Sequence, residues 1–133
     1  MKKTYTGSCH CGAVRYEADI DLATGTGRCN CSICRKNRHW GAMLQPGGFR
    51  LVAGSADLSS YQFGNKTSHH EFCRRCGVHT FIRGELPNGS SYVSVQLATL
   101  DDASDAELAG APVQYCNGRE NKWEEAPAET RNL

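Results

Sequence analysis

The chain has 133 residues, a length that fits one domain and allows a modest hydrophobic core. Lys and Arg number 15 against 14 for Asp and Glu, so the near-neutral charge gives no basis for non-specific binding to nucleic acid or to a membrane. No stretch approaches the length of a membrane span, and Lys2 and Lys3 are not followed by the apolar run of a secretory signal. We therefore expect a cytoplasmic protein.

Apolar and polar side chains alternate along much of the chain with a period of two, which is typical of half-buried strands. The clearest alternation follows the turn at Gly12, and fainter strands lie between glycine or proline turns. In chain order, the predicted strands cover 13–18, 49–52, 58–63, 79–83 and 92–97. The sequence therefore predicts a mainly β fold of short antiparallel sheets.

Only two segments favour a helix. One follows Cys31, with Ser32 as its predicted N-cap, and the other covers residues 103–108. Both are short. The polar tail from Glu124 onward has no apolar pattern, so we expect it to be loosely ordered.

Cysteine is the most informative residue type in the chain, because seven of the eight cysteines form a pair, a triplet and a second pair. The clusters are Cys9 and Cys11, then Cys29, Cys31 and Cys34, then Cys73 and Cys76. A disulfide framework would suit a small secreted domain, but no secretory signal is predicted. Thiols in a Cys-x-Cys pair are also badly placed to bridge each other. We therefore interpret the clusters as zinc sites.

The two cysteine pairs supply the four ligands that close a structural zinc site. Cys9 and Cys11 lie at the end of the first strand, and Cys73 and Cys76 form a knuckle in which Gly77 permits a tight turn. One shared zinc would pin the N-terminal hairpin to the middle of the sheet. The alternative is two separate half-sites completed by histidines, for which the candidates are His10, His69, His70 and His79.

The triplet of Cys29, Cys31 and Cys34 supplies three thiolates, so the fourth position of a second zinc stays open, as in catalytic zinc sites. A thiol substrate is the natural fourth ligand. Coordination lowers the pKa of such a thiol and holds it as a thiolate, which can then add to an electrophilic carbon.

A basic run follows the triplet and consists of Arg35, Lys36 and Arg38. These side chains can hold the carboxylates of a small acidic thiol, or they can form an ordinary solvated face. His39 comes next in the chain and is the predicted proton-transfer residue.

Three motifs also carry a family resemblance. They are Gly-Ser-Cys-His-Cys-Gly-Ala-Val at 7–14, Cys-Asn-Cys-Ser-Ile-Cys-Arg at 29–35 and Phe-Cys-Arg-Arg-Cys-Gly at 72–77. Their order and spacing resemble the glutathione-dependent formaldehyde-activating enzyme family, also called the centromere protein V-like family, and Trp123 adds a weaker match. The resemblance implies one domain over residues 1–133 with an Mss4-like β architecture. It also implies a structural zinc on Cys9, Cys11, Cys73 and Cys76 and a second zinc, with an exchangeable position, on Cys29, Cys31 and Cys34.

The activity that the resemblance implies is that of an S-(hydroxymethyl)glutathione synthase, a carbon–sulfur lyase in which the glutathione thiol adds to formaldehyde. The implied cofactors are two zinc ions per chain, with glutathione as co-substrate, and the partners are a small-molecule thiol and an aldehyde. One position departs from the family pattern, because Gln114, Tyr115 and Cys116 stand where a histidine is expected. The resemblance therefore implies no functional role for Gln114, Tyr115 or Cys116.

Two alternatives come from other functional classes. The chain can be a non-catalytic, zinc-stabilised glutathione carrier or protein-binding module, with His39 or His70 closing the second site, because a fold alone does not determine function. It can also be a redox sensor that uses the triplet thiols after metal loss.

Overall fold

The computed structural model describes residues 1–133 and contains ten strands, two α-helices and five short 3-10 turns. The strands are β1 (Lys3–Ser8), β2 (Arg15–Ile20), β3 (Thr26–Cys29), β4 (Trp40–Leu44), β5 (Phe49–Ala53), β6 (Leu58–Tyr61), β7 (Ser68–Cys73), β8 (His79–Glu85), β9 (Ser91–Gln96) and β10 (Val113–Cys116). The helices are α1 (Ser32–Asn37) and α2 (Asp105–Gly110). Neither helix is long and apolar enough to cross a membrane.

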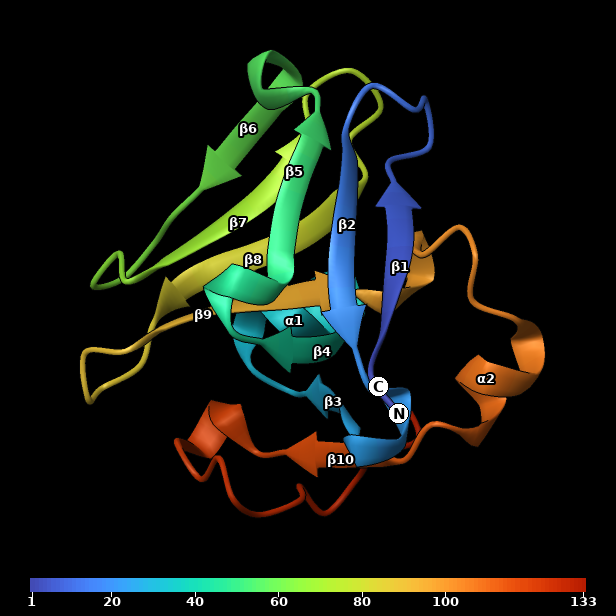
Figure 1. Cartoon of the computed structure of the whole chain (residues 1–133). Coiled ribbons are helices and arrows are strands. Elements are labelled where there is room, and N and C mark those ends of the chain that lie inside the picture. The colour runs from blue at the N-terminus through green and yellow to red at the C-terminus, as the bar shows by residue number, and fades with distance from the viewer.

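The strands form two sheets. One has three strands in the order β1-β2-β5, and the other has seven in the order β10-β3-β4-β9-β8-β7-β6. In Figure 1, β2 and β5 cross in front of the strands at the centre of the larger sheet. All neighbouring strands are antiparallel except β10 and β3, which are parallel. The predicted mainly β fold of short antiparallel sheets is therefore confirmed, with one parallel pair that the sequence did not indicate.

The core lies between the two sheets. Every second residue of β2 is buried, as the alternation in the sequence predicts, and the ring of Tyr16 faces the rings of Phe49 and Phe81 at centroid distances of 5.4 and 6.4 Å. Tyr16 also passes directly over Gly7, where a Cβ atom would lie 2.2 Å from the tyrosine ring. Gly7 therefore allows the close approach that puts Tyr16 in the core.

The strand prediction is correct in part. The five strands predicted with bounds correspond to β2, β5, β6, β8 and β9, and β1 is the first strand expected before Cys9, whereas β3, β4, β7 and β10 were not predicted. Their sequences lack a clear period of two, because they are interrupted by glycines, polar residues or a cysteine motif.

Both predicted helices exist, but their starts differ from the prediction. Helix α1 begins at Ser32 and Cys31 occupies the N-cap position, so the prediction of Ser32 as N-cap is wrong. Helix α2 begins two residues later than predicted, because Ser104 and Glu107 form a capping box that fixes its first turn. The tail from residue 124 onward contains no helix or strand.

Candidate functional site

The four thiols of the two cysteine pairs meet at one end of the molecule. Cys9 and Cys11 lie in the turn between β1 and β2, Cys73 ends β7, and Cys76 lies in the turn before β8. The four sulfur atoms all lie within 4.8 Å of one another, and no histidine belongs to the group. The structure therefore brings the two pairs together in one group rather than in two half-sites with histidines.

Two backbone turns of the same kind place these thiols. In the first turn the N–H of Cys9 donates to the carbonyl of Val14 at 3.0 Å, and in the second the N–H of Cys73 donates to the carbonyl of Val78 at 3.0 Å. Each turn also has a glycine with positive φ directly after its second cysteine: Gly12 has φ of 81° and Gly77 has φ of 79°. Glycine adopts this conformation without strain, so each turn can point both of its thiols inward.

Backbone N–H groups favour the ionised form of some of these thiols, whereas at Cys11, despite a backbone N–H bond, burial and contact with the other sulfurs raise the pKa to about 11. The N–H of Val14 donates to Sγ of Cys9 at 3.3 Å, and the N–H of Arg75 donates to Sγ of Cys73 at 3.4 Å. Backbone N–H groups also lower the pKa of the Cys76 thiol to about 6, because they stabilise the thiolate. Four thiolates this close fit one tetrahedral metal ion, and all-sulfur coordination is typical of structural zinc.

The triplet is built where β3 passes into α1. Cys29 ends β3, Cys31 caps α1, and Cys34 lies within that helix. The backbone N–H of Cys31 donates to Sγ of Cys29 at 3.3 Å, so the chain folds back on itself at this point. The contacts with Cys31 and Cys34 lower the pKa of the Cys29 thiol to about 2, and contact with Cys29 raises the pKa of Cys34 above its usual range. The three thiols thus lie on one short stretch of the chain, although only the four-cysteine group has all its ligand atoms within 4.8 Å.

Two hollows open on the triplet. One has a volume of about 490 Å³ and reaches Cys29 and Cys34, and the other has a volume of about 590 Å³ and reaches Cys31 and Cys34. Both hollows are lined by Cys34, Ile82, Tyr92 and Trp123. The triplet is therefore accessible to small molecules from two sides, which suits a site with an exchangeable ligand.

Trp123 reaches the triplet because Gly118 has no side chain. A Cβ atom at Gly118 would lie 2.7 Å from Sγ of Cys29 and 2.6 Å from the Trp123 ring. The indole N–H donates to the side chain of Asn121 at 2.7 Å, which orients the ring, and 53% of the tryptophan surface stays exposed. Trp123 therefore stands beside Cys29 as a wall that both hollows share.

His39 lies where the sequence predicted a proton-transfer residue. It lines the smaller hollow, and its Nε2 atom lies 3.0 Å from Oγ of Ser94. Gly41 leaves the room for this pair, because a Cβ atom there would lie 2.5 Å from the imidazole. Burial lowers the pKa of His39 to about 4, so the ring is neutral at pH 7. His70 is buried beside the larger hollow, where burial also lowers its pKa.

The predicted basic run is divided by the structure. Arg35 lines a separate hollow of about 280 Å³, together with Arg119, whereas Lys36 and Arg38 are exposed near the end of α1. The arginines that line the two hollows at the triplet are Arg28 and Arg119. The sequence did not indicate Arg119, because it is far from the cysteine motif in the chain.

Asn30 connects the C-terminal segment to the triplet. Its side chain donates to Asn117 at 3.0 Å and accepts from the backbone N–H of Arg119 at 3.0 Å. The parallel pairing of β10 with β3 places Cys116 opposite Cys29. Residues at opposite ends of the sequence therefore form one site.

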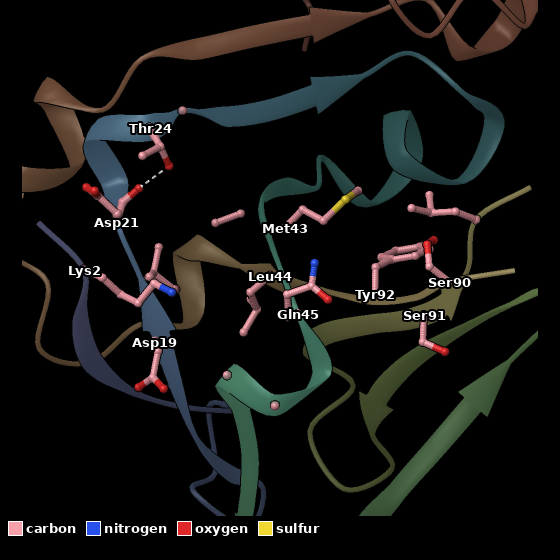
Figure 2. A pocket seen from close by; sticks show the side chains of 16 residues that line it. Lys2, Asp19, Asp21, Thr24, Met43, Leu44, Gln45, Ser90, Ser91 and Tyr92 are labelled. Carbon is pink, nitrogen blue, oxygen red and sulfur yellow. Dashed lines mark hydrogen bonds between the residues drawn. The ribbon is translucent and has the colours of Figure 1, made fainter. Parts of the chain in front are cut away.

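A hollow of about 710 Å³ lies away from the cysteines, between the end of β2 and the β8–β9 turn. Figure 2 shows Asp19, Asp21 and Lys2 on one side of it and Tyr92 on the other. Asp19 is bound to Arg50 at 2.9 Å, and Asp21 caps a short turn through Ala23 N–H. Since its two acids already have partners and it contains no cysteine or histidine, it is a weaker candidate for chemistry than the triplet.

Comparisons with known proteins place the chain in a family. The chain is 38% identical over 125 residues to a Halomonas elongata protein whose provisional name is glutathione-dependent formaldehyde-activating enzyme, and the match covers 76% of this chain and 80% of that protein. The crystal structure of a Rhodobacter sphaeroides protein superposes with a TM-score of 0.69 at 33% identity, over 82% of this chain and 99% of that one. The sequence model of the family described as glutathione-dependent formaldehyde-activating enzyme matches residues 4–117 of this chain. The chain belongs to the glutathione-dependent formaldehyde-activating enzyme family.

Proposed function

We propose that the protein joins the thiol of glutathione to formaldehyde or another small aldehyde, as a carbon–sulfur lyase of the S-(hydroxymethyl)glutathione synthase type. The observation that carries this proposal is a triplet of thiols, brought together where β3 passes into α1, that opens on two hollows of ligand size. Membership of the family and the name of the Halomonas protein support glutathione and formaldehyde as the substrates.

The donor sets support two zinc ions per chain. Cys9, Cys11, Cys73 and Cys76 would hold one ion in a closed, structural site. Cys29, Cys31 and Cys34 would hold the second, whose chemistry is to lower the pKa of a bound thiol and keep it as a nucleophile.

Arg35 and Arg119 are proposed to hold the carboxylates of the thiol substrate. They line one hollow together, and Arg119 also lies at the edge of a hollow at the triplet, so a carboxylate bound between the two arginines stays close to the triplet. Guanidinium groups bind carboxylates with two parallel hydrogen bonds, which orients the ligand as well as holding it.

The pair of His39 and Ser94 is proposed to carry the proton from the thiol to the carbonyl oxygen during the addition. The thiol loses a proton and the carbonyl oxygen gains one, so a neutral base beside the triplet can serve both steps. His39 is neutral because burial holds its pKa near 4, and its Nε2 is already hydrogen-bonded to Oγ of Ser94.

The direct test is the exchange rate between free glutathione and its formaldehyde adduct, measured by NMR exchange spectroscopy at equilibrium. The reaction also proceeds without a catalyst, so the expected result is an exchange rate that rises in proportion to protein concentration. A protein that binds one glutathione per chain without raising that rate would be a carrier, which is the alternative function.

Replacing Arg119 by alanine is expected to raise the KM for glutathione roughly 3–10-fold. An exposed charge-assisted contact strengthens the binding of a ligand by about this factor. The kcat should change much less, since the arginine is placed away from the reacting atoms. The matched control is Arg38→Ala, which removes an exposed arginine of the predicted basic run that lines none of the described hollows. An unchanged KM in the Arg119 variant would remove this residue from the substrate site.

A further inference from the structure

The larger hollow at the triplet is mostly apolar. Its volume is about 590 Å³, which is within the range of ligand pockets, and it opens on Cys31 and Cys34. Its apolar walls are Ile33, Phe63, Ile82, Tyr92 and Trp123.

The polar atoms of the aromatic walls are bound elsewhere. The hydroxyl of Tyr92 lies 3.1 Å from Oγ of Ser68, and the indole N–H of Trp123 donates to Asn121. The ring of Phe63 stacks on the ring of His70 at a centroid distance of 5.7 Å, and this contact orients the Phe63 side chain. The aromatic walls themselves therefore offer mainly carbon surface to an occupant, while Arg119 and His70 are among the polar side chains that also line the hollow.

Two of these rings are exposed to solvent. Phe63 is 43% exposed and Trp123 is 53% exposed, although both belong to residue types that are normally well buried. Apolar surface left open beside a reactive site is typical of a ligand groove, because an apolar occupant would remove that surface from water.

The two hollows share Ile82, Tyr92 and Trp123 but differ in the polar side chains that line them. The smaller hollow is lined by Arg28, His39, Ser94 and Gln114, which suit the amides and carboxylates of a peptide. Formaldehyde has a single carbon and would leave the larger, apolar hollow almost empty. The thiol and the electrophile can therefore occupy different sides of the triplet.

We propose that the preferred electrophile is an aldehyde with an apolar chain or ring, whose carbonyl carbon lies at the triplet and whose body fills the hollow between Phe63 and Trp123. This inference rests on the proposed thiol addition and names the class of its second substrate. In the reaction the S–H bond breaks, an S–C bond forms to the carbonyl carbon, and the proton passes to the carbonyl oxygen. Nothing is oxidised or reduced.

The first test needs no turnover. S-alkyl glutathiones are stable analogues of the adduct, and their dissociation constants can be measured by isothermal titration calorimetry with methyl, propyl and hexyl groups. Burial of each methylene should tighten binding by up to roughly fourfold, so the hexyl compound should bind much more tightly than the methyl one. Equal affinity across the series would overturn the proposal.

Two variants, each of which removes one aromatic ring, test whether the alkyl chain binds against Phe63. Phe63→Ala removes a wall of the hollow, whereas Tyr61→Ala removes a ring that stacks on Phe63 at 5.8 Å and does not line the hollow. Both rings are largely exposed, so both variants should fold. The expected result is that Phe63→Ala weakens hexyl binding several-fold and leaves methyl binding unchanged, and that Tyr61→Ala has a smaller effect on both. A similar loss for both ligands in the Phe63 variant would contradict the placement of the chain.

Exchange rates separate this inference from the function on which it rests. Hexanal and formaldehyde are compared as electrophiles, each with glutathione and each corrected for its rate without protein. A larger acceleration for hexanal supports the inference. Acceleration of the formaldehyde reaction alone overturns the inference and leaves the proposed function intact, while no acceleration with either aldehyde removes both.

Discussion

Replacing Cys73 by serine is expected to leave a chain that does not fold cooperatively at 25 °C. Cys73 is fully buried at the end of β7, and its sulfur is one of four within 4.8 Å. Structural zinc contributes about 10–16 kcal/mol to folding in small zinc-binding peptides, whereas whole domains are stable by only about 5–15 kcal/mol. Losing one of four ligands can therefore remove most of the stability of this chain.

The measurement is thermal unfolding by circular dichroism together with zinc content by mass spectrometry. The matched control is Cys116→Ser, which removes a half-buried thiol outside the four-cysteine group and should keep both the melting transition and the metal. A Cys73 variant with the melting temperature and zinc content of the parent would show that the group has no structural metal.

Replacing Cys31 by serine is expected to abolish thiol addition while the fold is kept. Cys31 is partly exposed at the N-cap of α1, where its side chain makes no capping hydrogen bond, so little of the fold depends on it. Loss of a hydrogen-bonding partner of a metal ligand already costs about 10–100-fold in activity or metal affinity. We therefore expect the loss of a ligand to lower kcat/KM by about 100-fold or more.

Three readouts distinguish this result from simple unfolding. The variant should keep the melting transition, retain one zinc ion per chain instead of two, and lose the glutathione adduct in native mass spectrometry. Ser32→Ala is the matched control at the next position of the chain, where the side chain is exposed. If the Cys31 and Cys73 variants unfold equally, the proposed division between a structural and a reactive site is wrong.

Much of the fold follows from patterns that are local in the sequence. The period of two in residues 13–18 predicted β2, and the glycine after each cysteine pair predicted the tight turns that the structure has at Gly12 and Gly77. The mainly β, Mss4-like architecture was therefore accessible from the sequence, through these patterns and through the resemblance of the motifs.

The walls of the site were much harder to predict. Arg119 and Gly118 take their roles from the pairing of β10 with β3, which joins segments almost ninety residues apart, and no local pattern encodes such a pairing. The predicted carboxylate contact covered Arg35, Lys36 and Arg38 together, on the ground that they are neighbours in sequence. On α1 successive side chains point about 100° apart, and of these three residues Arg35 lines a described hollow.

The pairing of β10 with β3 separates the residues at the entrance to the triplet from the residues that keep the chain folded, and this affects how the protein can evolve. The four-cysteine group and the core between the sheets use residues up to about Ala111, whereas Gly118, Arg119 and Trp123 belong to the segment that follows β10. Substitutions in that short segment can reshape the entrance to the triplet without touching the groups that keep the chain folded. A family built on this plan can exchange one substrate for another at little risk to its stability.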